Sequence, residues 1–264
     1  MCREVFDGNA GPPTPLSAAQ NIDINPDNAN AVEHLRDFTG LGEEAFNKRV
    51  ERKGRFHFNV EHMFYNPTTK DELRWFYASS VAYLFANVLH HSPKYIKYKR
   101  FVEDDGPVLS YSGGVGGSCI TFAKQGIRCT YMGIGLIEYA FAEYRVRRLG
   151  LEEFVSFLRP YSEKTNWKID PVLALPRDES FGIIEALDVL EHIPSYEHTV
   201  RAMVESLRPG GVIVENTPFA EITGADTDLR IHVSNGGIDM TTAMGPSMSF
   251  EEHERGVKIW RKKQ

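Results

Sequence analysis

The stretch Val108-Leu-Ser-Tyr-Ser-Gly-Gly-Val-Gly-Gly117 decides the fold of this chain. It begins as a short apolar run, passes through a glycine-rich turn, and leads into helical sequence at 119–125. A turn of this kind lets backbone N–H groups approach a ligand closely, and the start of the following helix adds a partial positive charge. The stretch therefore predicts either a ligand-binding turn or, as the simpler alternative, a tight connection between a strand and a helix.

Strands and helices alternate from this turn to the end of the chain. Further strands are predicted at Arg128–Met132, Phe181–Leu187, Val212–Glu215 and Gly256–Trp260, and helices at Ile137–Leu149 and His198–Leu207. Alternation of this kind is typical of βαβ units, in which helices cover both faces of a mainly parallel sheet. The predicted fold class is α/β.

A second motif, Phe181-Gly-Ile-Ile-Glu-Ala-Leu-Asp-Val-Leu-Glu-His-Ile-Pro194, places polar side chains after a predicted strand. Asp188, Glu191 and His192 follow the strand's carboxyl end, where open parallel sheets form their ligand crevices. Two acids and an imidazole can perform acid–base chemistry or hold a metal ion. The alternative is structural, with Asp188 capping the turn and Glu191 solvated.

Three stretches together resemble the class I S-adenosylmethionine-dependent methyltransferases. They are VLSYSGGVGG, ALDVLEHI and LRPGGVIVENTPF, and GVKIWRKK is similar to the family's closing strand. The resemblance covers about three-fifths of the chain, residues 107–261. It implies a Rossmann-like, seven-stranded, mostly parallel sheet with an antiparallel edge strand.

The chain departs from the family pattern at three acid positions. Ser110 stands in place of the acid that opens the glycine-rich motif, and Ser112 replaces its first glycine. Gly133 stands where the family has the acid that binds the ribose hydroxyls, and Gly182 replaces a third acid. A carboxylate on a ribose diol makes charge-assisted bonds worth roughly 1.5–3 kcal/mol. We expect either that another residue supplies the acceptor and the cofactor binds in the usual way, or that the chain binds the cofactor abnormally or not at all. If the crevice is otherwise intact, Gly133→Asp should tighten binding.

The resemblance assigns a role to each candidate site residue. His192 is the expected base, oriented by Glu191, with Asp188 in the same cluster. The residues expected to bind S-adenosylmethionine are Ser110, Ser112, Gly113, Gly114, Gly116, Gly133, Ile134 and Leu187. No metal is favoured. The alternative is a divalent ion held by Asp188, Glu191, His192 and His232, as in relatives with a Glu-x-x-Glu-His motif.

The expected activity is methyl transfer to a small-molecule or peptide acceptor. One alternative is an enzyme that uses the same donor without methylation, such as a cyclase of its aminobutyrate chain. Another is a binding protein that kept the fold and lost the cofactor. Aromatic residues of the first half are candidates for the substrate side: Tyr65, Trp75, Tyr77 and Tyr83.

The chain is expected to have three parts. Residues 1–30, rich in Pro, Asn and Gly, predict a flexible tail; residues 31–104 predict a helical lid; residues 105–264 predict the methyltransferase-like core. In the lid, helices are expected near 30–40, at Glu43–Lys53 and at Thr68–His91, the last opening with the capping pattern Thr69-Lys-Asp-Glu72.

Composition narrows the classes of partner and compartment. The 264 residues carry a net charge of −6, which gives no overall basic field for nucleic acid. No apolar stretch approaches the length of a membrane span, and the N-terminus lacks the apolar core of a signal peptide. Three cysteines are too few for a disulfide framework, so a reducing, cytoplasmic setting is expected. The sequence does not specify an oligomeric state.

Overall fold

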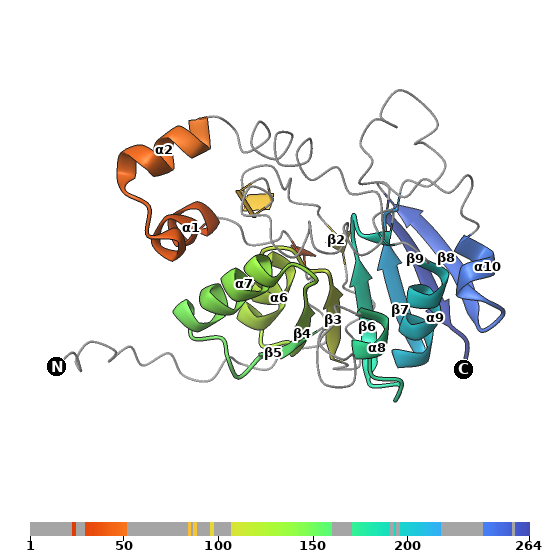
Figure 1. Ribbon diagram of the computed structural model, residues 1–264. Helices are drawn as coiled ribbons and strands as arrows, with labels where there is room; N and C mark the ends of the chain where they lie inside the picture. The colour runs from red at the N-terminus through yellow and green to blue at the C-terminus, as the bar shows by residue number, and fades with distance from the viewer. Residues whose placement is uncertain are drawn as a thin grey trace, which may run out of the picture.

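The computed structural model describes most of the second half of the chain and short segments of the first half. The described residues are 23–24, 30–51, 84–85, 87–88, 96–97, 107–159, 171–190, 193, 196–217, 240–254 and 257–264. Helices of the second half lie on the two sides of one sheet (Figure 1). The predicted α/β class is confirmed.

The sheet has seven strands. They are β3 (Val108–Tyr111), β4 (Cys129–Met132), β5 (Val155–Leu158), β6 (Phe181–Ala186), β7 (Leu207–Glu215), β8 (Met248–Glu254) and β9 (Val257–Lys262). Their order across the sheet is β5-β4-β3-β6-β7-β9-β8. The five strands from β5 to β7 are parallel, and β9 runs antiparallel to both of its neighbours.

Two details of the sheet differ from the sequence expectation. The antiparallel strand β9 lies one place in from the edge, because β8 pairs along its outer side. Strand β7 begins at Leu207, before the predicted strand Val212–Glu215, and its register with β6 shifts between Phe181 and Ile183. Strands β5 and β8 were not predicted, since their partly exposed sequences lack an uninterrupted apolar run.

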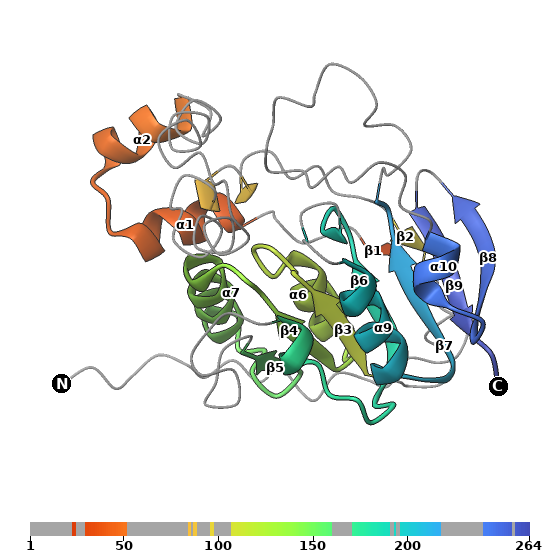
Figure 2. The ribbon, with the colours of Figure 1, turned by 45° about the vertical axis from the view of Figure 1, so that its right-hand side comes forward.

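Alternating strand residues divide the core into two layers. Val108, Ile183 and Val212 pack with α6 (Gly117–Lys124) and α7 (Leu136–Arg148) on one face. Leu109, Ile184 and Ile213 pack on the other face with α9 (Tyr196–Ser206) and α10 (Met240–Met244), next to α8 (Pro171–Ala174). Because successive side chains of a strand point to opposite faces of the sheet, each strand contributes residues to both layers of the core. Figure 2 shows this arrangement from a second side.

Helix α1 (Ala31–Thr39) of the first half packs against α7. It contacts α7 through Phe38, whose ring lies 5.2 Å from that of Phe141, and through an Asp37–Arg148 ion pair of 2.9 Å. Helix α2 (Glu43–Glu51) follows after Gly40, which ends α1 with a φ of 62°. Both helices were predicted. Of the expected helix 68–91, only residues 84–85 and 87–88 are described, and they are helical.

A two-stranded pair adds to this part of the chain. Strand β1 (Asp23–Ile24) is antiparallel to β2 (Ile96–Lys97). Two residues of the expected tail therefore form a strand; the other residues of 1–29 lie outside the described part. None of the helices in the described segments is long and apolar enough to cross a membrane.

Candidate cofactor and active site

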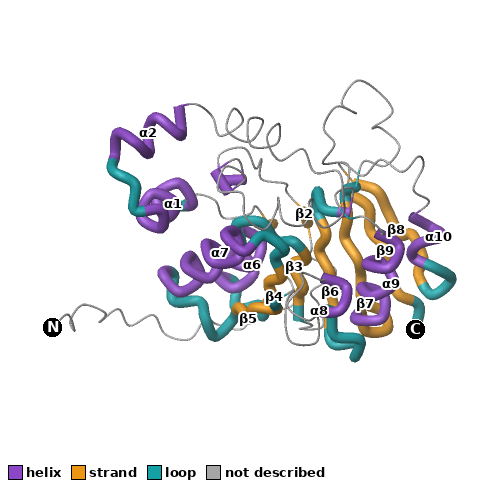
Figure 3. Tube along the Cα trace, in the orientation of Figure 1, coloured by secondary structure: helices purple, strands orange, loops and turns teal. Residues whose placement is uncertain are grey.

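The glycine-rich turn connects β3 to α6 at the carboxyl end of the sheet (teal in Figure 3). Its backbone enters the left-handed region three times, at Ser112 (φ 56°), Gly114 (50°) and Gly116 (79°). These are the three glycine positions of the family motif, so Ser112 adopts a conformation that favours glycine. The N–H of Gly116 donates to the carbonyl of Gly113 at 2.9 Å, which closes the turn directly before α6.

Side chains from two other elements hold the turn. The Tyr131 hydroxyl of β4 donates to the carbonyl of Gly114 at 2.7 Å. The Arg145 guanidinium of α7, almost completely buried, donates to the carbonyl of Val115 at 2.6 Å. Because both bonds reach backbone carbonyls, they fix the path of the turn and not only the position of one side chain.

Open space adjoins the middle of the turn. A Cβ atom placed on Gly114 would meet no atom within 4 Å, whereas one placed on Gly113 would lie 2.6 Å from the Ser110 hydroxyl. Gly113 is thus required by packing, and Gly114 leaves room for a ligand to approach the backbone.

The space that a side chain at Gly133 would enter is filled by a tyrosine. Gly133 follows β4, and a Cβ atom there would overlap the Tyr131 hydroxyl. The Tyr131 ring is 1% exposed and packs against Tyr139 and Phe157. The expectation of tighter binding by Gly133→Asp assumed an intact crevice, and Tyr131 would first have to move to make room for that side chain.

The one acid that follows β4 closely, Glu138, is a buried group in the first turn of α7. Its carboxylate accepts a hydrogen bond from the Asn87 side-chain amide. Burial raises the pKa of Glu138 to about 8, and the bond from Asn87 opposes the shift. At neutral pH the side chain is therefore mostly a neutral acid. Residues Leu84, Phe85 and Val88, next to Asn87 in the sequence, share an apolar cluster with Val115 of the turn.

Asp188 lies at the same edge of the sheet, after β6. Its backbone N–H donates to the Asn216 side-chain carbonyl at 2.6 Å, and the Asn216 amide donates back to the Asp188 carboxylate at 2.7 Å. This reciprocal pair joins the ends of β6 and β7. It agrees with the capping alternative for Asp188, whose φ of 51° places it in the left-handed region.

Of the remaining predicted site residues, the structure describes two, and the others lie outside the described part of the chain. Ile134 and Leu187 are half-buried at the ends of β4 and β6. Outside the described residues lie Glu191, His192, His232, Tyr65, Trp75, Tyr77 and Tyr83. Within the described segments, no group of three His, Cys, Asp or Glu side chains could hold a metal ion. The single-cluster hypothesis for Asp188, Glu191 and His192 stays a prediction.

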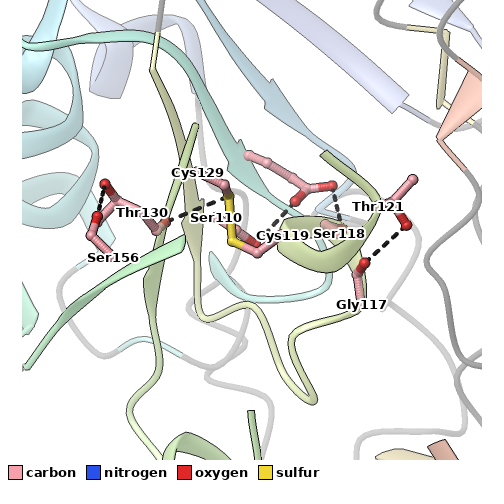
Figure 4. Close-up of a disulfide and its surroundings, with 9 residues drawn as sticks. Ser110, Gly117, Ser118, Cys119, Thr121, Cys129, Thr130 and Ser156 are labelled. Atoms are coloured by element: carbon pink, nitrogen blue, oxygen red, sulfur yellow. Dashed lines mark hydrogen bonds between the residues drawn. A yellow bond between two sulfur atoms is a disulfide. The ribbon is translucent and has the colours of Figure 1, made fainter. Parts of the chain in front are cut away.

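A disulfide joins the helix that follows the turn to the neighbouring strand β4. Cys119 of α6 and Cys129 of β4 are bonded, with their Cα atoms 5.4 Å apart (Figure 4). The cysteine count did not predict this bond. Three cysteines exclude a framework of several disulfides, but they still allow one. The bond fixes the first turn of α6 to the strand whose Tyr131 holds Gly114.

Sequence reasoning missed several residues of the site. Glu185 was read as part of an apolar strand, Tyr131 as a strand residue, and Asn216 and Arg145 were not singled out. A polar residue inside an apolar strand is a usable signal, and Glu185 carried it. The roles of Tyr131 and Arg145 depend on contacts across the fold, for which the sequence holds no local sign.

The chain belongs to a methyltransferase family. The family model described as "Methyltransferase domain" matches residues 77–255, which is more than half of the chain. The strand order and the glycine-rich turn agree with the class I, Rossmann-like fold of that family.

The individual relatives match a smaller part of the chain than the family model does. The chain is 32% identical over 109 residues to norajmaline N-methyltransferase of Rauvolfia serpentina, covering 40% of this chain and 34% of that protein. It thus spans about a third of the length of this relative. Among solved structures, the [4+2]-cyclase SpnF is 25% identical with a TM-score of 0.38, covering 45% of this chain and 41% of SpnF. The N-methyltransferase NodS of Bradyrhizobium japonicum is 16% identical with a TM-score of 0.41, covering 60% and 79%.

Proposed function

We propose that this protein transfers the methyl group of S-adenosylmethionine to a small-molecule or peptide acceptor. The observation that carries the proposal is the glycine-rich turn between β3 and α6, with left-handed residues at three alternate positions and open space beside Gly114. Membership of the methyltransferase family supports the same reading. The N-terminus of α6 adds a positive potential where a carboxylate of the ligand would bind.

Different residues of the site would contact the methionine part and the adenine of S-adenosylmethionine. Ser112, Gly113, Gly114 and Gly116 would face its methionine part, and Ile134 and Leu187 would flank its adenine. The Tyr131 phenol fills the space beside Gly133, the position proposed to face the ribose. When bound, the donor supplies an electrophilic methyl carbon, so the protein's task is to align an acceptor with it and remove a proton.

His192 is the proposed base, with Glu191 orienting it. Asp188 would hold the start of this segment through its pair with Asn216. We further propose that residues 31–104 cover the site, which agrees with the cluster that Leu84, Phe85 and Val88 form with Val115.

Calorimetric titration with S-adenosylhomocysteine tests cofactor binding, with Gly114→Ala and Gly150→Ala as a matched pair. Both glycines have positive φ (50° and 66°), and a Cβ atom on either would meet nothing within 4 Å. The backbone strain of the two variants should therefore be similar, roughly 1 kcal/mol. Only Gly114→Ala should weaken binding, by about tenfold or more. Equal affinities in the two variants, or no binding by the wild type, would refute the proposal.

The chemical step needs its own measurement. Mass spectrometry of reactions containing S-adenosylmethionine and a panel of amines and phenols should detect products heavier by one CH2 unit, since a methyl group replaces a proton. His192→Ala should lower turnover by roughly 10²- to 10⁴-fold, and chelators should have no effect if no metal takes part. Unchanged turnover in His192→Ala would remove this residue from the mechanism.

A further inference from the structure

A carboxylate is buried beneath the glycine-rich turn, although no acid is present in the turn motif itself. Glu185 belongs to β6, whose six residues are all buried, and it is 3% exposed. Burial of a carboxylate costs several kcal/mol unless polar groups satisfy it. Such a residue in the centre of an apolar strand therefore requires an explanation.

The partners of Glu185 come from the two ends of the turn. The Ser110 hydroxyl of β3 donates to one carboxylate oxygen at 3.1 Å, and the Ser118 hydroxyl of α6 donates to the other at 3.0 Å. Ser110 and Glu185 are register partners on neighbouring parallel strands. Ser110 and Ser118 lie close together beside the disulfide in Figure 4. One carboxylate thus connects the strand before the turn with the helix after it.

The carboxylate lies next to the position where the family pattern has an acid. That position is Ser110 here, and the Glu185 carboxylate contacts its hydroxyl from the adjacent strand. Ser118 lies in the first turn of α6, where the helix dipole favours a negative charge. The Ser110 hydroxyl also lies against the backbone of Gly113, and a Cβ atom placed on Gly113 would be 2.6 Å from it. The hydrogen-bonded group of Ser110, Glu185 and Ser118 therefore contacts the turn itself.

We propose that Glu185 is a positioning residue that replaces the missing motif acid and holds the turn in its cofactor-binding form. This inference rests on the proposed binding of S-adenosylmethionine. It goes beyond that proposal because it predicts that the acid can be moved between two strands without loss of binding.

A transposition experiment tests the proposal. Glu185→Ser should weaken S-adenosylhomocysteine binding by at least tenfold. Ser110→Asp alone should also weaken it, since two carboxylates would then face each other. The double variant Ser110→Asp/Glu185→Ser should bind within about threefold of the wild type. A double variant that binds no better than the single ones, while remaining folded by circular dichroism, would overturn the proposal.

A conservative variant separates positioning from general stability. Glu185→Gln keeps the shape and should weaken binding by about 5- to 30-fold. The control is Glu215→Gln, since Glu215 is equally buried in β7 and accepts hydrogen bonds from Trp260 and the Thr217 N–H. Its affinity for S-adenosylhomocysteine should remain that of the wild type. Equal loss of affinity in both variants would contradict a specific role for Glu185.

Hydrogen exchange distinguishes failure of this inference from failure of the proposed function. If Glu185 orders the turn, Glu185→Gln should speed amide exchange at residues 114–118 by tenfold or more, with or without cofactor. If the wild type does not bind S-adenosylhomocysteine but this exchange is faster, the proposed function fails and the ordering role stands. If exchange is unchanged, the ordering role fails.

Discussion

Replacement of Glu138 by Gln should make the protein more stable, and by an amount that grows with pH. The carboxyl group is buried in the first turn of α7, and its pKa is raised from 4.5 to about 8 by desolvation. The folded state therefore prefers the protonated form. The unfolding free energy is highest below pH 4.5, where Glu138 is protonated in both states. It falls as pH rises towards 8, because the unfolded chain releases the Glu138 proton at lower pH than the folded chain does.

The size of the effect follows from the shift. Each pKa unit of difference between folded and unfolded states corresponds to about 1.4 kcal/mol. The wild type should lose about 3 kcal/mol of unfolding free energy by pH 7 and about 4 kcal/mol above pH 8, relative to pH 4.5. Gln cannot ionise, and its side-chain carbonyl can still accept the hydrogen bond from Asn87. The variant should therefore gain these amounts over the wild type.

Urea unfolding at pH 5, 7 and 9 measures this difference directly. The control is Glu143→Gln on the same helix, since Glu143 is partly exposed in an ion pair with Arg147 and its replacement should change stability by no more than about 1 kcal/mol. The difference between Glu138→Gln and the wild type should be smallest at pH 5 and largest at pH 9. A difference that is constant with pH would refute the reasoning, because it would show that Glu138 ionises with the same pKa in both states.

Three further changes test the site. Ser112→Gly should stabilise the protein by about 0.5–1 kcal/mol because φ is 56° there, and a lower melting temperature would contradict this. Cys119→Ser/Cys129→Ser should destabilise it by about 3 kcal/mol, as expected for a bridge across a sequence separation of 10, and reductant should then have no further effect on its melting temperature. Gly133→Asp should lower stability by about 1–3 kcal/mol and should not tighten S-adenosylhomocysteine binding, because its side chain displaces the Tyr131 hydroxyl from Gly114; calorimetry showing tighter binding would mean that Tyr131 moves at little cost.

The strands and helices around the glycine-rich turn were predictable because their signals are local. The apolar run before Ser110, the glycines at 113–117 and the helical sequence after them specify a strand, a turn and a helix within ten residues. The same holds for β6 and the Asp188 motif. Edge strands β5 and β8 were missed because partial exposure removes the apolar pattern that identifies a buried strand.

The sequence by itself determined the family, the alternation of elements and the absence of acids at Ser110, Gly133 and Gly182. Only the tertiary structure decided what occupies those places. Glu185 reaches the space beside Ser110 from a neighbouring strand, and Tyr131 reaches the space beside Gly133 from two residues earlier on its own strand. Side-chain reach across a sheet depends on register and packing, which residues 75 positions apart in the chain cannot reveal by their spacing.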